Sequence, residues 1–284
     1  STIVALAQEV SHTPIRTFTV AVGGESDESA AAALVARHLG TDHTTLALPD
    51  VDAVDLANRV ATVHDEPFGD PSAIPTALLC AAARDHVTVA LSGDGADELL
   101  GGYNRHRVAQ GQLSRLLTLP RSVRTGISKG LSAVPSSRWD GLARALPGGV
   151  TGVGTKVQKL AAALSADDAW GAYTALATQW NPAQLLVAPP ATVGPAIRPL
   201  RGSGIFAEVL LADQASTLPD DMLVKVDRAS MAVALEVRVP FLSHKFVELT
   251  WRLPEGAKFR DGEGKWLERQ VLDQYVPQTL WDRP

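Results

Sequence analysis

The chain has 284 residues, of which 45% are hydrophobic, and a formal net charge of −5. This length and composition allow a sizeable core, favour two subdomains and give no indication of disorder. Binding to a phosphate backbone requires concentrated Lys and Arg side chains. The balance here is acidic and no basic cluster is present, which argues against nucleic acid as the main partner.

The single cysteine, Cys80, excludes an internal disulfide framework and a metal site made of several thiolates, and it suits a reducing cytosol. Because Cys80 lies in an apolar run, we expect it to pack in the core. We find no signal peptide and no apolar stretch of about 18 residues, so the sequence predicts neither export nor a membrane span. The expected location is cytoplasmic.

The first part of the chain alternates strand and helix patterns. Strands rich in β-branched residues are predicted at 16–22, 44–48 and 87–91, and helices at about 27–40, 51–63 and 73–84. Such alternation implies parallel βαβ crossovers, so the expected fold class is α/β with a parallel, doubly wound sheet. The first residues look like the middle of a βα unit, which we interpret as a sign that the chain is a piece of a longer polypeptide.

After about residue 110 the alternation gives way to a predominantly helical pattern. We therefore divide the chain into an α/β part at 1–110 and a helical part at 111–284. The segment 111–201 carries little chemical signal, and we find no internal repeat.

The strand at 87–91 leads into a turn that carries most of the chemical signal. Its continuous apolar run is typical of a strand buried on both faces of a parallel sheet. Gly93 and Gly95 allow the backbone to turn sharply after it. The carboxyl end of such a strand is where open α/β sheets bind ligands, and it is followed here by Asp94, Asp97 and Glu98.

These acidic residues leave two interpretations open. Acids before a helix are often N-caps and dipole partners, which contribute about 0.5–2 kcal/mol without a function. Three acids within five residues exceed what one cap needs, however, and they would suit a divalent metal that prefers hard oxygen ligands and a bound polyphosphate.

A loop at 64–76 contains three prolines and is expected to be stiff. It is either a plain crossover loop or a segment in which Ser72 and Thr76 present hydroxyls to a substrate. His64 alone is weak evidence, because such a histidine is more often packed or on the surface than catalytic.

A helix is predicted around residues 220–233, with Asp220 as a plausible N-cap and one apolar face packed inward. Asp221, Lys225 and Arg228 fall on another face at i, i+4 and i+7. The pattern favours a solvated, ion-paired stripe there, and the alternative is a lining for anionic groups.

Lys265 lies at the expected start of another helix, after a turn that Gly262 and Gly264 should make flexible. A cation at a helix N-terminus is opposed by the helix dipole. This placement makes sense if Lys265 meets an anion.

Four motifs, in this order and spacing, resemble the synthetase domain of glutamine-dependent asparagine synthetases. They are residues 66–75, 91–103, 225–241 and 264–266, and the resemblance covers essentially the whole chain. It implies a fold of the adenine-nucleotide alpha-hydrolase type and a reaction that uses ATP and Mg²⁺. In this family the β-carboxylate of aspartate attacks the α-phosphorus, pyrophosphate leaves, and ammonia then displaces AMP to give asparagine.

The resemblance also implies roles for single residues. Asp97 matches a position that helps hold magnesium over the pyrophosphate, and Asp94 an acidic position associated with the second half-reaction. Lys265 matches the lysine that stabilises charge on the reacting carboxylate and phosphate. Nucleotide contacts fall on Ser92, Gly93 and, on the adenine side, Val20. Substrate-facing positions fall on Ser72, Thr76, Asp221, Lys225 and Arg228.

Two parts of the family pattern are missing from residues 1–284. These are the pyrophosphate loop Ser-Gly-Gly-Leu-Asp-Ser and the amino-terminal glutaminase domain that supplies ammonia from glutamine. Glycine-rich loops cradle phosphates with backbone N–H groups, so we expect this chain alone to bind ATP poorly and not to use glutamine. The resemblance is also compatible with a homodimer.

Two other functions stay open. Related β-lactam synthetases and lasso-peptide cyclases keep the adenylation but let an internal amine close a ring. A non-catalytic remnant is the alternative outside enzyme chemistry, and the missing pyrophosphate loop is the reason to consider it.

Overall fold

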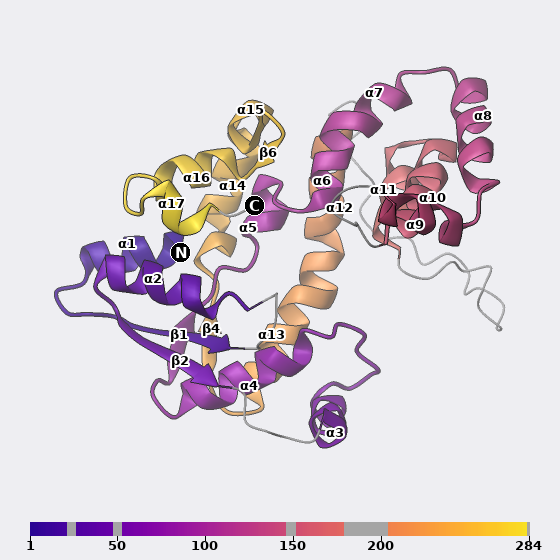
Figure 1. The fold of residues 1–284 in the computed structure, drawn as a ribbon. Coiled ribbons are helices and arrows are strands. Elements are labelled where there is room, and N and C mark those ends of the chain that lie inside the picture. The colour runs from indigo at the N-terminus through magenta and orange to yellow at the C-terminus, as the bar shows by residue number, and fades with distance from the viewer. Residues whose placement is uncertain (22–26, 48–52, 146–151, 179–203, 283–284) are drawn as a thin grey trace. The chain divides into compact units, whose positions relative to one another are not determined.

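The computed structural model describes residues 1–21, 27–47, 53–145, 152–178 and 204–282 (Figure 1). The chain forms two compact units. The first comprises Ser1–Leu100, Thr217–Phe259 and Lys265–Pro284, and the second Gly101–Ser216 and Arg260–Gly264. These units are defined by compactness. The division into an α/β part at 1–110 and a helical part at 111–284 was based on sequence pattern and stays a prediction.

The first unit contains the alternating strands and helices. Its amino-terminal elements are α1 (Thr2–Val10), β1 (Arg16–Ala21), α2 (Ser29–Leu39), β2 (Asp42–Ala47), α3 (Ala53–Val63), α4 (Ala73–Arg84), β3 (Val89–Leu91) and α5 (Ala96–Leu100). Its later elements are η3 (Leu218–Leu223), α13 (Val224–Met231), β4 (Glu236–Arg238), η4 (Pro240–Leu242), α14 (His244–Arg252), α15 (Glu255–Lys258), α16 (Trp266–Leu272) and α17 (Gln278–Trp281).

Local signals explain where several elements begin and end. The Asp27 carboxylate accepts the backbone N–H of Ser29 at 2.8 Å, at the start of α2. Gly40 ends that helix with a φ of 71°, which glycine adopts without a steric penalty. The predicted strand ends at residues 22 and 48 and the predicted helix start at 51–52 lie outside the described residues.

Strands β1 to β4 pair in parallel, which is typical of an α/β fold. Strand β1 pairs with β2 from Arg16 opposite Asp42 to Ala21 opposite Ala47. Strand β3 pairs with β4 from Val89 opposite Glu236 to Leu91 opposite Arg238. The described strands group as two-stranded sheets, so the α/β class is observed, whereas one continuous doubly wound sheet is not seen in the described part of the chain.

The prediction that β3 is buried on both faces is wrong. Ala90 packs against a core cluster that contains Cys80 and Leu235. Val89 and Leu91 are 41% and 53% exposed. Successive side chains of a strand point to opposite faces, so β3 is a half-buried strand although its sequence is continuously apolar.

The second unit is helical, as the pattern after residue 110 indicates. Its helices are α6 (Asn104–Val108), η1 (Ala109–Leu113), α7 (Ser114–Leu117), α8 (Arg121–Ser132), α9 (Ser136–Arg144), α10 (Val153–Ser165), α11 (Ala169–Ala177) and α12 (Ile205–Ala215). Helix α10 packs against α8, α9 and α11, and Leu113 and Leu164 belong to the core there. None of the helices formed by the described residues has the length and apolarity that crossing a membrane requires.

A short hairpin precedes α16. Its strands are β5 (Phe259–Arg260) and β6 (Glu263–Gly264). Between them Asp261 and Gly262 have φ values of 54° and 85°. Two successive positive φ values are the mark of a type I′ turn, for which Asp-Gly is a preferred pair. The expected flexible turn is therefore a defined hairpin, and Gly264 belongs to its second strand.

Candidate active site

The turn after β3 is tied to β4 and folded back on itself. The backbone N–H of Ser92 donates to the carbonyl of Arg238 at 3.0 Å. The Ser92 hydroxyl donates to the Asp94 carboxylate, and the backbone N–H of Asp94 donates to Ser92 Oγ at 3.2 Å. Gly95 has a φ of 87°, and a Cβ there would collide with Leu242, so this turn requires glycine. Gly93, in contrast, is exposed and has open space around it.

The three acids of this turn do not share one site. Glu98 is 1% exposed and lies in the interior, whereas the Asp97 side chain keeps 36% of its surface exposed. The described residues contain no group of three or more His, Cys, Asp and Glu placed to hold a metal ion. Mg²⁺ typically uses one or two carboxylates together with waters and substrate phosphates, so Asp97 fits such an ion as a single protein ligand.

Lys265 reaches the same acidic turn from the other end of the chain. Its Nζ lies 3.0 Å from Oδ1 of Asp97, and its side chain is 30% exposed. Lys265 is the N-cap of α16 and has a φ of 55°. The anion that Lys265 meets in this structure is the Asp97 carboxylate.

A second group of side chains joins the loop before α4 to helix α13. Nζ of Lys225 donates to Asp70 Oδ2 at 2.6 Å and to Ser72 Oγ at 2.8 Å. Lys225 is only 7% exposed, so a solvated stripe is wrong for this residue. Arg228, one turn further on, is more exposed and pairs with Asp65 at 2.5 Å.

Asp70 was not among the residues expected from the sequence. Its Oδ1 accepts the backbone N–H of Ser72 at 2.8 Å, and its Oδ2 accepts the Ser72 hydroxyl at 2.7 Å. An Asp two residues before a Ser is a common local turn motif, and that was the only sequence signal for it. Burial raises the pKa of the Asp70 carboxyl, but hydrogen bonds from Lys225 and Ser72 outweigh burial and hold that pKa below its ordinary value.

The hydroxyls of Ser72 and Thr76 both donate hydrogen bonds within the protein. Thr76 lies in the first turn of α4 rather than in the loop, and its hydroxyl donates to the Ser72 carbonyl at 2.7 Å. The Ser72 hydroxyl donates to Asp70. The structure thus brings Ser72 and Lys225 together at Asp70, and Thr76 is bonded to the Ser72 carbonyl. A substrate would meet the oxygen lone pairs of the two hydroxyls.

The remaining expected residues have simpler positions. Val20 lies on β1 opposite Leu46. Asp221 lies in η3, a π-helical turn that leads into α13. His64 is packed: it is 7% exposed, its Nδ1 donates to the Val60 carbonyl at 3.0 Å, and its ring stacks on Phe68.

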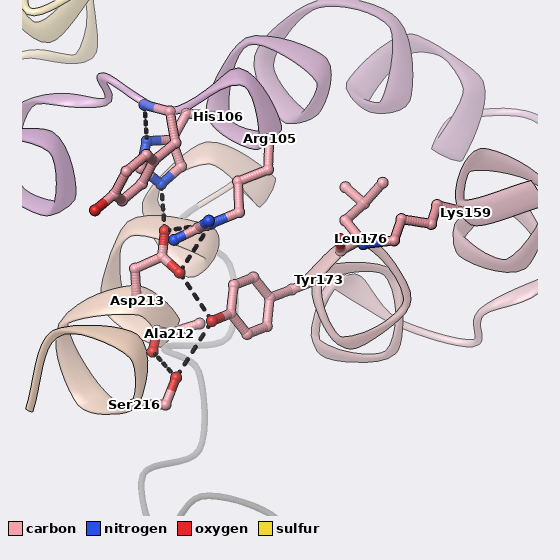
Figure 2. A network of polar contacts seen from close by, with 9 residues as sticks. Arg105, His106, Lys159, Tyr173, Leu176, Ala212, Asp213 and Ser216 are labelled. Atoms are coloured by element: carbon pink, nitrogen blue, oxygen red, sulfur yellow. Dashed lines mark hydrogen bonds and ion pairs between the residues drawn. The ribbon is translucent and has the colours of Figure 1, made fainter. Parts of the chain in front are cut away.

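The second unit contains a polar network that was not predicted from the sequence (Figure 2). The Asp213 side chain is fully buried, and its oxygens accept from Arg105 Nε at 2.8 Å, His106 Nε2 at 2.5 Å and the Tyr173 hydroxyl at 2.8 Å. His106 Nδ1 accepts the backbone N–H of Tyr103 at 3.3 Å, which places the ring hydrogen on Nε2.

This network is a structural one. Burial raises the pKa of Asp213, but the hydrogen bonds from His106 and Arg105 outweigh burial and lower that pKa. A buried carboxylate with several donors is satisfied and needs no ligand. The signal in the sequence was an Asp in the last turn of a mostly apolar helix, because a buried acid must find partners.

The arrangement of motifs around Asp97, Asp70 and Lys265 can be compared with known proteins. The family model described as asparagine synthase matches residues 1–284. The chain belongs to the asparagine synthase family. The matched residues include the motifs from both ends of the sequence that the first unit contains.

Several curated relatives are similar to nearly the whole of this chain. A putative glutamine-hydrolyzing asparagine synthetase of Mycobacterium bovis is 30% identical over 294 residues, which are 99% of this chain and 42% of that protein. One of Mycobacterium tuberculosis strain H37Rv gives the same figures. Asparagine synthetase 1 of Bacillus subtilis is 28% identical over 293 residues, covering 100% of this chain and 43% of that protein. The chain thus spans less than half the length of these relatives.

Proposed function

We propose that the protein that carries this chain makes asparagine from aspartate and ATP through a β-aspartyl-AMP intermediate, and that this chain supplies the adenylating part. The observation that supports this most is the distance of 3.0 Å between Lys265 Nζ and Asp97 Oδ1. A metal-binding carboxylate and a charge-stabilising lysine must lie side by side to act on one phosphate chain.

Each residue of the pair has a role in this proposal. Asp97 would hold Mg²⁺, which when bound would supply charge neutralisation on the leaving pyrophosphate. Lys265 stabilises the negative charge that develops on the reacting carboxylate and α-phosphate, which is electrostatic stabilisation by a preorganised cation. Asp94 acts in the second half-reaction, when ammonia attacks.

The two residues neutralise each other in the absence of ligands. If the Asp97 carboxylate held a cation, Lys265 would lose its counter-ion and its ammonium would be available to the substrate. Both side chains are about one-third exposed, so a ligand can reach the pair from solvent.

Binding residues are proposed on the same basis. Nucleotide contacts are assigned to Val20, Ser92 and Gly93. Contacts to aspartate and phosphate are assigned to Ser72, Thr76, Asp221, Lys225 and Arg228. Arg228 suits an anion best among the basic residues of α13, because its partner Asp65 is exposed and the exchange of partners costs little.

The wider setting is also a proposal. It comprises a doubly wound parallel sheet of the adenine-nucleotide alpha-hydrolase type, ammonia from a glutaminase domain, a homodimer and a cytoplasmic location. Residues 1–284 lack the Ser-Gly-Gly-Leu-Asp-Ser loop. We therefore propose that this chain alone binds ATP weakly and is inactive.

Product analysis of the full-length protein tests the proposal. With aspartate, ATP, Mg²⁺ and glutamine it should form asparagine, AMP and pyrophosphate in equal amounts. Pyrophosphate release that depends on another carboxylate with an internal amine would favour a ring-closing relative. Absence of Mg²⁺–ATP binding in calorimetry would favour a non-catalytic remnant.

A further inference from the structure

Gly264 lies where one stretch of backbone approaches another. A Cβ built on Gly264 would collide with the carbonyl oxygen of Gly101, lie 2.8 Å from the carbonyl carbon of Gly101 and lie 3.3 Å from Cα of Gly102. Backbone atoms cannot rotate away as a side chain can. Any residue other than glycine at 264 must therefore push the two segments apart.

The opposing segment has little room to retreat. Gly101 has a φ of 79°, and a Cβ there would lie 2.7 Å from Cζ of Phe206. Phe206 is 3% exposed and so is itself held in the core. The close approach of Gly264 to Gly101 is thus supported from behind by a packed aromatic ring.

Asp97 and Lys265 both lie close to this contact in the sequence. Asp97 lies on α5, which ends at Leu100, and Lys265 follows Gly264. The backbone N–H of Lys265 donates to the Leu100 carbonyl at 2.9 Å. The backbones that carry the ammonium and the carboxylate are therefore joined at the point where Gly264 allows contact.

The conformation of Lys265 supports a functional reason for this arrangement. Its φ of 55° lies in the left-handed region, which lysine rarely adopts and which glycine or asparagine would adopt more easily. Such a conformation persists where the surroundings determine it and the side chain is needed.

We propose that Gly264 is a positioning residue whose close backbone contact with Gly101 sets the distance between the Lys265 ammonium and the Asp97 carboxylate. The catalytic consequence rests on the function proposed above. The geometric part does not, and the two can be tested separately.

The geometric part is tested by labelling the Lys265 amine in Gly264→Ala with an amine-reactive reagent, quantified by mass spectrometry against the exposed Lys129. Loss of the partly exposed ion pair should raise the labelling rate of Lys265 about threefold. Gly256→Ala is the matched control, because a Cβ there has no neighbour within 4 Å. An unchanged rate at Lys265 in folded Gly264→Ala would overturn the proposal.

The catalytic part is tested in the full-length protein. Gly264→Ala should lower kcat for aspartate-dependent pyrophosphate release about tenfold to hundredfold while KM for ATP changes little. In a Lys265→Ala background the same substitution should have no further effect. An equal loss in both backgrounds would show a merely structural role and refute positioning.

Amide hydrogen exchange of the wild-type protein covers the case in which Gly264→Ala does not fold. The Lys265 amide should exchange at least about a hundredfold more slowly than an unstructured amide. Exchange at the unprotected rate would contradict the proposed contact. If labelling and exchange behave as expected but wild type releases no pyrophosphate with aspartate, the proposed function fails and the positioning role stands.

Discussion

Lys265 Nζ lies 3.0 Å from Asp97 Oδ1, although the two residues belong to motifs far apart in the sequence. Both side chains are about one-third exposed, and such pairs contribute only about 0–1 kcal/mol to stability. The pair therefore contributes little to folding, and the role that we propose for it is chemical.

Replacing Lys265 should separate these two effects. Lys265→Ala is expected to slow aspartate-dependent pyrophosphate release by at least about a hundredfold, because it removes a preorganised charge from the reacting groups. The free energy of unfolding should change by no more than about 1 kcal/mol. Lys129→Ala, on an exposed part of α8, is the control and should match wild type in both measurements. Unchanged turnover in Lys265→Ala would remove this residue from the mechanism.

The loop before α4 offers a comparison of a buried and an exposed ion pair. Asp70→Ala leaves the buried Lys225 ammonium without its carboxylate and should lower the free energy of unfolding by about 3–5 kcal/mol. Asp65→Ala removes the exposed partner of Arg228 and should cost about 1 kcal/mol or less. Denaturant unfolding measures both. Equal losses of unfolding free energy in the two variants would show that the buried Asp70–Lys225 pair stabilises the protein no more than the exposed pair does.

Acid should destabilise the protein partly through Asp213. The pKa of this carboxyl is lower in the folded chain than in the unfolded one. The unfolded state therefore binds the proton first as pH falls. The stabilisation is complete above the unfolded value of about 3.9 and is lost as pH falls through the folded pKa.

Unfolding of wild type and Asp213→Asn between pH 3 and 7 measures this contribution. The stability difference between the two proteins should shrink as the pH falls below about 4. A difference that stays constant over this range would exclude ionisation of Asp213 as its cause.

Cys80 should be unreactive in the folded protein. It is 5% exposed, and burial, together with the charge of Asp94, raises the pKa of its thiol to about 11. The thiolate is the reactive form, so little of it exists at neutral pH. A disulfide reagent should modify Cys80 only after denaturant is added. Rapid modification of the native protein would show that this part of the core opens readily.

The elements that the sequence predicts well are those with local causes. The end of α2 at Gly40 and the half of the chain with helical periodicity follow from residues that are close in sequence. The position of Lys265 at the start of a helix also follows from residues that are close in sequence. An apolar run, however, does not reveal which neighbours cover a strand, and for this reason the exposure of Val89 and Leu91 was not foreseen.

The side-chain partners depend on tertiary placement. Asp70 meets Lys225 and Asp213 meets His106 across more than a hundred intervening residues. No pattern of neighbouring residues in the sequence determines which acidic side chain pairs with each basic one. The close contact of Gly264 with Gly101 is equally nonlocal. The sequence suggested a flexible turn there, because glycine permits a flexible turn as well as a close approach of two backbones.

The most direct test of the central claim follows oxygen from aspartate into AMP. Full-length protein is incubated with ATP, Mg²⁺, glutamine and aspartate whose β-carboxylate carries oxygen-18. Attack of that carboxylate on the α-phosphorus, followed by displacement by ammonia, leaves one labelled oxygen in the phosphate of AMP, and mass spectrometry should find it there. Label that appears in inorganic phosphate, or in no phosphate product, would contradict adenylation of aspartate.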